Sequence, residues 1–285
     1  MEWERAKSYL IIFFLLLNAG LGVLLFMESR RYTVAPEQER LIRTVLDQNG
    51  ISMYTMLMRR FPPMRPLEIR GLYYDTDALL SILFENPYAV EQSTVFGQQI
   101  FQYGASMMTI SNGFITYENP YGSRNRPGAT NDLTASSASA LTNTFVRSYF
   151  PDFRLDSNFR VGDNFRIIYR QEYRGQLIHS NFIEFLVTPL GITMIDMQFG
   201  QVLGHTGSLE RIFSPDEALL VFVQRVRQFS LEEPMSIELM DLVFFKEYVS
   251  DQEETYQAVP FYRIFTKCRA DRPFLINAFT NTIID

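Results

Sequence analysis

Hydrophobic residues follow two different patterns along the chain. From Ser8 to Met27, twenty consecutive residues carry no charge. A helix of this length rises about 30 Å, the thickness of the hydrocarbon core of a bilayer. We therefore predict a transmembrane helix over residues 8–27. Beyond it, apolar positions alternate with polar ones or recur every three to four residues, which is typical of half-buried strands and amphipathic helices.

A cleaved signal peptide is the alternative interpretation of the apolar run, because a short basic segment precedes it. The run is longer than the usual hydrophobic core of about 7 to 15 residues, and its exit, Phe-Met-Glu-Ser-Arg-Arg, offers no small-x-small cleavage site. Both features favour a retained single-pass anchor in the cell membrane. Basic residues flank the run on both sides, so they do not settle its orientation. The bulk of the chain after the span favours a cytoplasmic tail, residues 1–7, and an extracytoplasmic body.

The ends of the predicted span carry residues suited to the membrane interface, where aromatic rings and basic side chains are enriched. These are Trp3, Arg5, Lys7 and Tyr9 on one side, and Arg30 and Arg31 on the other.

Asn18 interrupts the apolar run near its middle, beside Ala19, Gly20 and Gly22. An amide in hydrocarbon requires a hydrogen-bond partner, and small residues allow a second helix to approach closely. These four residues are therefore the predicted contact site for a partner helix. In the alternative reading, Asn18 bonds its own backbone and the glycines have no role.

The body is expected to be an α+β fold made of two tandem helix-plus-antiparallel-sheet subdomains, residues 28–125 and 126–285. The Gly-, Pro- and Asn-rich stretch 119–135 suggests the boundary between them. Asn112-Gly113 predicts a two-residue hairpin turn between Met107–Ser111 and Phe114–Glu118. Helices are expected over 36–49, 76–84 and 136–149, and from a capping box at Ser214 to about Phe229. Strands are expected over 67–75, 165–175, 176–188, 192–200, 237–249, 260–268 and 273–284.

Composition removes several classes of function. Of the 285 residues 47% are hydrophobic and 20% are charged, which excludes general disorder. A net charge of −6 argues against a nucleic-acid partner. Cys268 is the single cysteine and there are two histidines, so neither a disulfide nor a thiolate zinc site can form within the chain. We expect no metal and no cofactor.

Candidate chemistry in the body is sparse. The sequence contains none of the motifs GxSxG, HExxH, GxxxxGK[ST] and SxxK, and no GxGxxG follows a strand. The remaining candidates are better explained as ordinary structural residues. They are the glycines 200, 204 and 207 around His205, the carboxylates Asp75, Asp77, Asp251, Glu253 and Glu254, the strand residue His179, and Cys268 between Lys267 and Arg269. No catalytic residue is nominated.

Short motifs at both ends of the chain resemble the YycI (WalI) family of Gram-positive bacteria. At the start they are Met1-Glu2-Trp3, Arg5, Lys7 and, within the apolar run, Leu17-Asn18. Near the end, Pro260–Ile264 is similar to the family's Pro-x-Trp-Arg-Ile strand, and Ile276–Thr280 to its Ile-Asn-Ala-Tyr-Thr-Gly ending. Tyr262 stands in place of Trp, and Asn281 in place of Gly.

The resemblance implies a bitopic protein whose external body is similar to the later domains of the sister protein YycH. In that family the two proteins associate with the sensor histidine kinase WalK (YycG) and modulate it, largely through their transmembrane helices, thereby adjusting cell-wall metabolism. No catalytic residue or cofactor is implied. We therefore expect a non-enzymatic regulator in a two-component system. The alternative is an anchored cell-envelope enzyme, or an inhibitory or ligand-binding module, with an external site that the sequence does not reveal.

Overall fold

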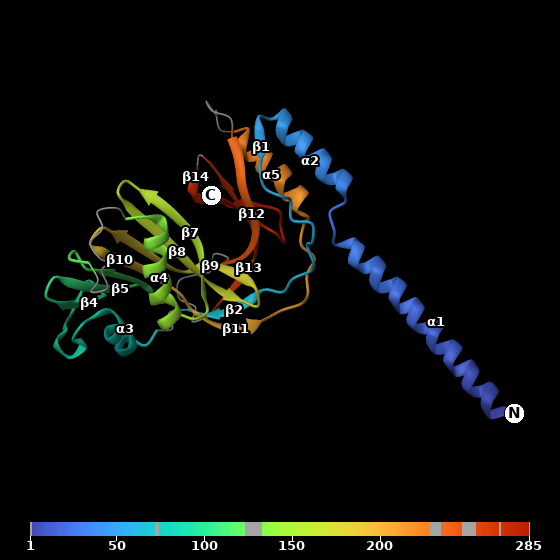
Figure 1. The fold of residues 1–285 in the computed structure, drawn as a ribbon, viewed down its shortest axis with the longest axis horizontal. Coiled ribbons are helices and arrows are strands. Elements are labelled where there is room, and N and C mark those ends of the chain that lie inside the picture. The colour runs from blue at the N-terminus through green and yellow to red at the C-terminus, as the bar shows by residue number, and fades with distance from the viewer. Residues whose placement is uncertain are drawn as a thin grey trace. The chain divides into compact units, whose positions relative to one another are not determined.

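The computed structural model describes residues 2–71, 74–122, 133–228, 235–246, 255–267 and 269–284 (Figure 1). The chain forms two compact units. The anchor unit comprises Met1–Met64, Leu209–Asp241 and Ile264–Asp285, and the sheet unit comprises Arg65–Ser208 and Leu242–Arg263. The fold is mixed α+β, as predicted. The tandem layout is not confirmed, because the expected boundary at residues 125 and 126 lies within the sheet unit and the anchor unit draws on three separate segments.

Helix α1 (Glu2–Arg31) contains the predicted span. Its window Lys7–Leu24 is long and apolar enough to cross a membrane, and none of that window is buried in the protein. Twenty or more helical residues with an apolar surface on every side require an apolar environment that the described part of this chain does not supply. The helix is therefore consistent with a single-pass anchor.

The rest of the anchor unit is built around two capped helices. Helix α2 (Pro36–Gln48) starts with proline at its first turn and buries Ile42 and Leu46. Helix α5 (Pro215–Val226) starts at the predicted cap, where Glu217 accepts hydrogen bonds from the backbone nitrogen and hydroxyl of Ser214 at 2.7 and 2.8 Å. It ends at Val226, three residues before the predicted end.

Five strands contribute residues to the described part of this unit. Strand β1 (Ile51–Met53) pairs in parallel with the first part of β12 (Met235–Lys246), and β14 (Arg269–Asn277) pairs antiparallel with β15 (Ile283–Ile284). Strand β12 and strand β13 (Thr255–Thr266) each begin in one unit and end in the other. Such returns of the chain cannot be detected in local patterns of polarity.

The sheet unit is dominated by an antiparallel series of strands in the order β7-β8-β9-β10-β6-β5-β4-β3. The predicted meander from 165 to 200 is confirmed as β8 to β10, and the predicted Asn112-Gly113 turn joins β5 to β6 with positive φ at both residues. The strands are β2 (Leu67–Arg70), β3 (Glu91–Val95), β4 (Gln98–Tyr103), β5 (Ser106–Ser111), β6 (Phe114–Glu118), β7 (Phe153–Val161), β8 (Asn164–Tyr173), β9 (Gln176–Thr188), β10 (Gly191–Gln198) and β11 (Gln201–His205).

Two helices pack on this sheet, α3 (Thr76–Leu83) and α4 (Ala135–Tyr149), as Figure 1 shows. Leu79 of α3 and Ala138 and Val146 of α4 belong to one hydrophobic core with strand residues such as Phe185 and Ile195. A short 3₁₀ turn, η1 (Pro87–Ala89), follows α3. Both helices agree with the predicted ranges to within one residue at each end.

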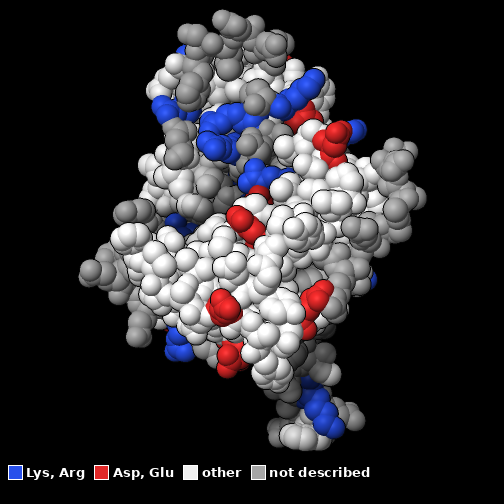
Figure 2. Space-filling view, turned by 90° about the vertical axis from the view of Figure 1, so that its left-hand side faces the viewer, with Lys and Arg blue, Asp and Glu red and all other residues white. Residues whose placement is uncertain are grey.

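Charge is unevenly spread over the surface. On the face shown in Figure 2, uncharged residues cover most of the described area, Asp and Glu lie singly, and Lys and Arg gather in the upper part of the view. The net negative charge of the chain therefore does not produce a continuous acidic surface on this face.

Candidate functional site

The predicted contact residues lie on the exposed surface of α1. The Asn18 side chain donates a hydrogen bond from Nδ2 to the carbonyl oxygen of Phe14 at 2.8 Å. This is the local backbone bond of the alternative reading. An amide has a second N–H donor and a carbonyl acceptor, so one local bond leaves Asn18 able to bond a neighbouring helix as well.

Helical geometry divides the four predicted residues. At 100° per residue, Asn18, Ala19 and Gly22 fall within an arc of about 100°, whereas Gly20 lies about 160° from Gly22. No heavy atom lies within 4 Å of a Cβ built on Gly20 or Gly22. Of the four predicted contact residues, Asn18, Ala19 and Gly22 thus share one side of α1, and Gly20 lies on another side of the helix.

The predicted interface residues are in helical positions at the ends of the apolar window. Trp3 and Tyr9 are exposed, and the Lys7 ammonium lies 5.3 Å from the centre of the Trp3 ring. Arg31 is exposed at the other end. The side chains of Arg5 and Arg30 lie outside the described residues.

A buried charged cluster in the sheet unit was not predicted. Arg263, which has no solvent exposure, donates two hydrogen bonds to the Asp156 carboxylate, at 2.7 and 2.9 Å. Arg170 donates to the same carboxylate from Nε at 2.8 Å, and its Nη1 donates to the backbone oxygen of His179. Arg263 Nη1 also lies 3.3 Å from His179 Nδ1, which accepts because a guanidinium can only donate.

Irregular strand pairing positions this cluster. The register between β7 and β8 shifts between Leu155 and Ser157, and the register between β8 and β9 shifts between Arg170 and Gln171. Bulges of this kind redirect a side chain relative to its neighbours. Asp156 lies at the first shift, and Arg170 is the last residue before the second and still pairs with Phe182.

The cluster changes the protonation of its members. Burial alone would raise the pKa of Asp156, but the hydrogen bonds and positive charges of Arg263 and Arg170 outweigh it and lower the pKa. Burial, followed by the charges of Arg170 and Arg263, holds the pKa of His179 well below its ordinary value. His179 is therefore a neutral acceptor at physiological pH and serves this ion-pair network.

The other candidates from the sequence have structural roles where the structure describes them. Asp75 caps α3, accepting from the backbone nitrogens of Asp77 and Ala78 at 3.0 and 3.2 Å. The glycines around His205 flank or belong to strand β11, which pairs with β2. Within the described residues there is no group of three or more potential metal ligands. Asp251, Glu253, Glu254 and Cys268 lie outside the described residues.

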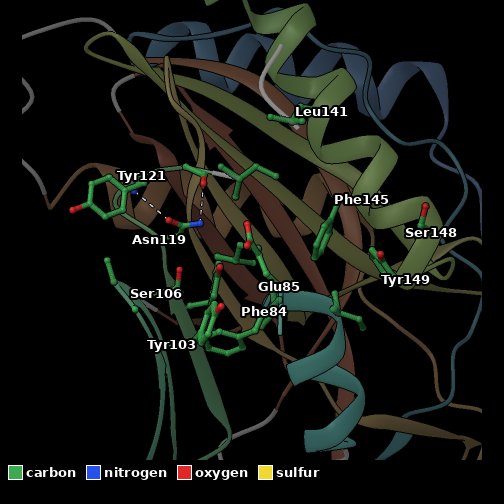
Figure 3. Close-up of a pocket in the computed structure, with 18 of the residues that line it drawn as sticks. Phe84, Glu85, Tyr103, Ser106, Asn119, Tyr121, Leu141, Phe145, Ser148 and Tyr149 are labelled. Carbon is green, nitrogen blue, oxygen red and sulfur yellow. Dashed lines mark hydrogen bonds between the residues drawn. The ribbon is translucent and has the colours of Figure 1, made fainter. Parts of the chain in front are cut away.

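An aromatic cleft of about 720 Å³ opens between α3 and α4 on the sheet unit (Figure 3). Tyr117 of β6 and Ile195 of β10 line it from the sheet, Phe145 from α4 and Phe84 from the end of α3. In Figure 3, Asn119 and Tyr121 lie on the side opposite α4, and Tyr103 lies near Phe84. The lining comes from five separate segments without a shared motif, so no local pattern in the sequence points to it.

Comparison with known proteins identifies a fold but no family. No protein-family model matches the chain, and no curated protein matches it. An uncharacterized protein from Eubacterium rectale ATCC 33656 is similar with a TM-score of 0.53 and 12% identity, over 82% of this chain and 90% of that one. The C-terminal domain of Bacillus megaterium YpeB gives a TM-score of 0.38 and 11% identity, over 75% and 98%. The first likeness shows a shared fold; the resemblance to the YycI family is not confirmed.

Proposed function

We propose that this protein is a non-enzymatic, membrane-anchored regulator of a WalK-type sensor histidine kinase, acting with a YycH-type sister protein through contacts between transmembrane helices. The observation that carries the proposal is α1, an apolar helix that no described part of the protein covers and that presents Asn18, Ala19 and Gly22 on one face. The motifs at the two ends of the chain supply the choice of partner.

The proposed mechanism requires the face of α1 to distinguish two states of the kinase. A helix that bound both states equally would shift no equilibrium, however tightly it bound. Gly22 lets a partner backbone approach closely in the state where the helices are parallel and near, and Asn18 then adds an interhelical hydrogen bond worth about 0.6 to 2 kcal/mol. A difference of this size changes the balance of two kinase states by roughly 3- to 30-fold.

The proposed orientation places residues 1–7 in the cytoplasm and the body outside. Protease added to intact cells should then remove the body, while the chain isolated from membranes should still begin at Met1 or Glu2. A mature chain beginning near Glu28 would contradict the anchor.

The face of α1 is tested by kinase co-purification with full-length variants. Asn18→Leu combined with Gly22→Ile should lose most kinase association and the regulation of a target promoter, because it removes the amide and blocks close approach. Gly20→Ile is the matched control, since it adds the same side chain on another side of the helix. The proposal would be contradicted if both variants co-purified with the kinase as well as the wild-type protein does. Full regulation by a body secreted without residues 1–31 would also contradict it.

The alternative of an anchored ligand-binding module has one observation in its favour, the aromatic cleft of the sheet unit. Such a module would tolerate changes to the face of α1 and respond to changes in the cleft. One chain can both regulate a kinase and bind a ligand. Changes to the face of α1 test the first function, and changes to the cleft test the second.

A further inference from the structure

Strand β3 forms one end of the antiparallel series in the sheet unit, and its outer edge is open to solvent. Among the described strands it pairs with β4 alone, and all five of its residues are exposed. Strand β7, at the other end of the series, has a register shift and carries Arg154, Asp156 and Arg160, which are features that protect an edge from pairing. Strand β3 has no register shift, no proline and no lysine, and its single charge is Glu91 at its first position. This edge therefore lacks most of the usual protection.

The hairpin turn fixes which backbone groups of β3 face outward. Phe96 and Gly97 join β3 to β4 with φ of 49° and 80°, as in a type I′ turn. The residues on either side of such a turn are hydrogen-bonded to each other. Alternation along the antiparallel ladder then directs the backbone groups of Ser93 toward β4 and those of Gln92 and Thr94 outward. The edge thus offers one N–H and one C=O group at each of these two outward positions.

The sequence of β3 is complementary to itself in the antiparallel direction. When a second copy is placed about a twofold axis at Ser93, Gln92 of each copy lies opposite Thr94 of the other, so the outward groups of both residues can pair. Glu91 then lies opposite Val95. The two Glu91 residues are about 14 Å apart along the strands, which exceeds the Debye length of about 8 Å at physiological salt. A parallel arrangement would instead place the two carboxylates side by side.

Exposed aromatic side chains flank this edge at both ends. Phe96 in the turn is fully exposed, and Tyr88 in η1, before β3, is 98% exposed. A bulky residue at positive φ, such as Phe96, is uncommon. In the antiparallel arrangement Phe96 of one copy is level with Val90 of the other, two residues after Tyr88. The pairing therefore brings the exposed rings of each copy towards apolar residues of the other, which removes apolar surface from water.

We propose that β3 is a dimerisation edge, at which two copies of this chain pair antiparallel about a twofold axis at Ser93. A twofold contact is closed, so the pairing stops at two copies. With about four backbone hydrogen bonds the contact is weak by itself, and anchoring of both copies in one membrane raises their effective concentration. The inference does not involve the kinase and is independent of the proposed function.

Cysteine cross-linking of the full-length protein in membranes tests the proposed register. All variants carry Cys268→Ser, and copper–phenanthroline is the oxidant. Ser93→Cys should give a disulfide-linked dimer, because opposite Cα atoms at such a position are about 4.5 Å apart, within the range of about 4.4 to 6.8 Å found in disulfides. Val95→Cys is the matched control on the same face of β3. Its two copies lie about 14 Å apart, so it should give at least about fivefold less dimer.

A mixed pair of variants makes the test specific for this twofold axis. Chains with Glu91→Cys and chains with Val95→Cys, produced together, should form linked dimers that neither variant forms alone, because these positions lie opposite each other. Adding Ser93→Lys to both chains should lower this cross-linking by about fivefold or more, since it places like charges directly opposite. Ser81→Lys, at an exposed serine of α3, is the control and should leave it unchanged. Matching melting curves show that the fold is intact in every variant.

Three results would overturn the proposal. The first is equal cross-linking of Ser93→Cys and Val95→Cys, which includes the case in which neither is linked because a segment of another protein occupies the edge. The second is a mixed pair that cross-links no more than its single variants do. The third is cross-linking that Ser93→Lys and Ser81→Lys change equally. None of these results affects the test of α1, because residues 2–31 are unchanged in every variant.

Discussion

Helix α1 and the charged cluster of the sheet unit both place polar groups in apolar surroundings, and they satisfy them in opposite ways. Asn18 of α1 bonds a carbonyl four residues earlier in its own helix. Asp156 bonds Arg263, which lies 107 residues later in the sequence, and Arg170 from another strand. The first arrangement exists without any tertiary structure, whereas the second exists only when the sheet is complete.

Because of this difference, the charged cluster matters for the stability of the fold and α1 does not. A buried ion pair contributes little net stability over an apolar pair, but loss of one partner is costly because a charge is left unpaired. The cluster therefore makes the sheet unit depend on correct register. The α1 helix has no such internal dependence, so its side chains are available for lipid and for a partner helix.

The largest expected effect is loss of the Asp156 charge. Asp156→Asn removes the buried carboxylate charge that Arg263 and Arg170 share, and we expect the free energy of unfolding to fall by about 3 to 5 kcal/mol. Asp163→Asn is the control, because the Asp163 carboxylate is exposed and lies 3.9 Å from Arg160; it should cost less than about 0.5 kcal/mol. Urea denaturation of the full chain followed by circular dichroism measures both. Similar urea midpoints for the two variants would show that the cluster does not stabilise the sheet unit.

The next effect is a pH dependence caused by His179. Its pKa is lowered in the folded state, so below about pH 6.5 the unfolded state binds a proton that the folded state does not. Stability should therefore fall as the pH drops from about 6.5 towards 5, with a slope of at most about 1.4 kcal/mol per pH unit. Asp156 adds to this pH dependence only at lower pH. Its stabilisation is present at neutral pH and is lost as the pH falls through its own lowered pKa.

Paired histidine variants isolate this dependence. His179→Asn keeps an acceptor near Arg263 and should flatten the profile of urea midpoint against pH between 6.5 and 5. His205→Asn, which changes the other histidine, should leave the slope in place. A flat profile in the wild-type protein would mean that His179 does not lose its proton on folding.

A smaller effect is expected from the buried hydroxyl pair between α4 and β8. Thr142 Oγ1 lies 3.0 Å from the Tyr169 hydroxyl, and Thr142 also bonds the Ala138 carbonyl oxygen at 3.2 Å. Since Thr142 keeps its local bond, Tyr169→Phe should lower the free energy of unfolding by only about 1 kcal/mol. Tyr54→Phe, at an exposed ring, provides the baseline in the same urea titration. A loss comparable to that of Asp156→Asn would show that this bond belongs to a larger network.

The smallest effect on stability should come from α1. Asn18→Leu combined with Gly22→Ile removes no tertiary contact of the described residues, so the free energy of unfolding of the body should change by less than about 0.5 kcal/mol. A clear shift would show that α1 supports the fold of the body.

Local signals explain which parts of the fold could be predicted from the sequence. The apolar run, the proline and capping box of α5, and the Asn112-Gly113 turn each act within a few residues, and each gave the correct element. Parallel pairing of β1 with β12 places Ile51 opposite Met235. No local sequence pattern indicates a pairing between residues so far apart in the chain. For this reason the helices and the meander were predicted, while the discontinuous units were not.

The same limit applies to the sites. The candidate contact residues of α1 were selected from the sequence because Asn18 is the one amide within an apolar run. Asp156 looked like an ordinary strand residue, since a bulge and a distant arginine create its environment. The cleft combines residues from α3, α4 and three parts of the sheet, none of which carries a motif.

Replacement of the span is the most direct test of the proposal that α1 carries the regulatory contacts. Residues 8–27 would be exchanged for an unrelated apolar helix of the same length, without Asn, Gly or Ala, in the otherwise unchanged full-length chain. If α1 carries these contacts, we expect normal membrane insertion, an unchanged urea midpoint of the body, and loss of kinase co-purification to background. Full kinase association with the exchanged span would contradict it and assign the contacts to the body.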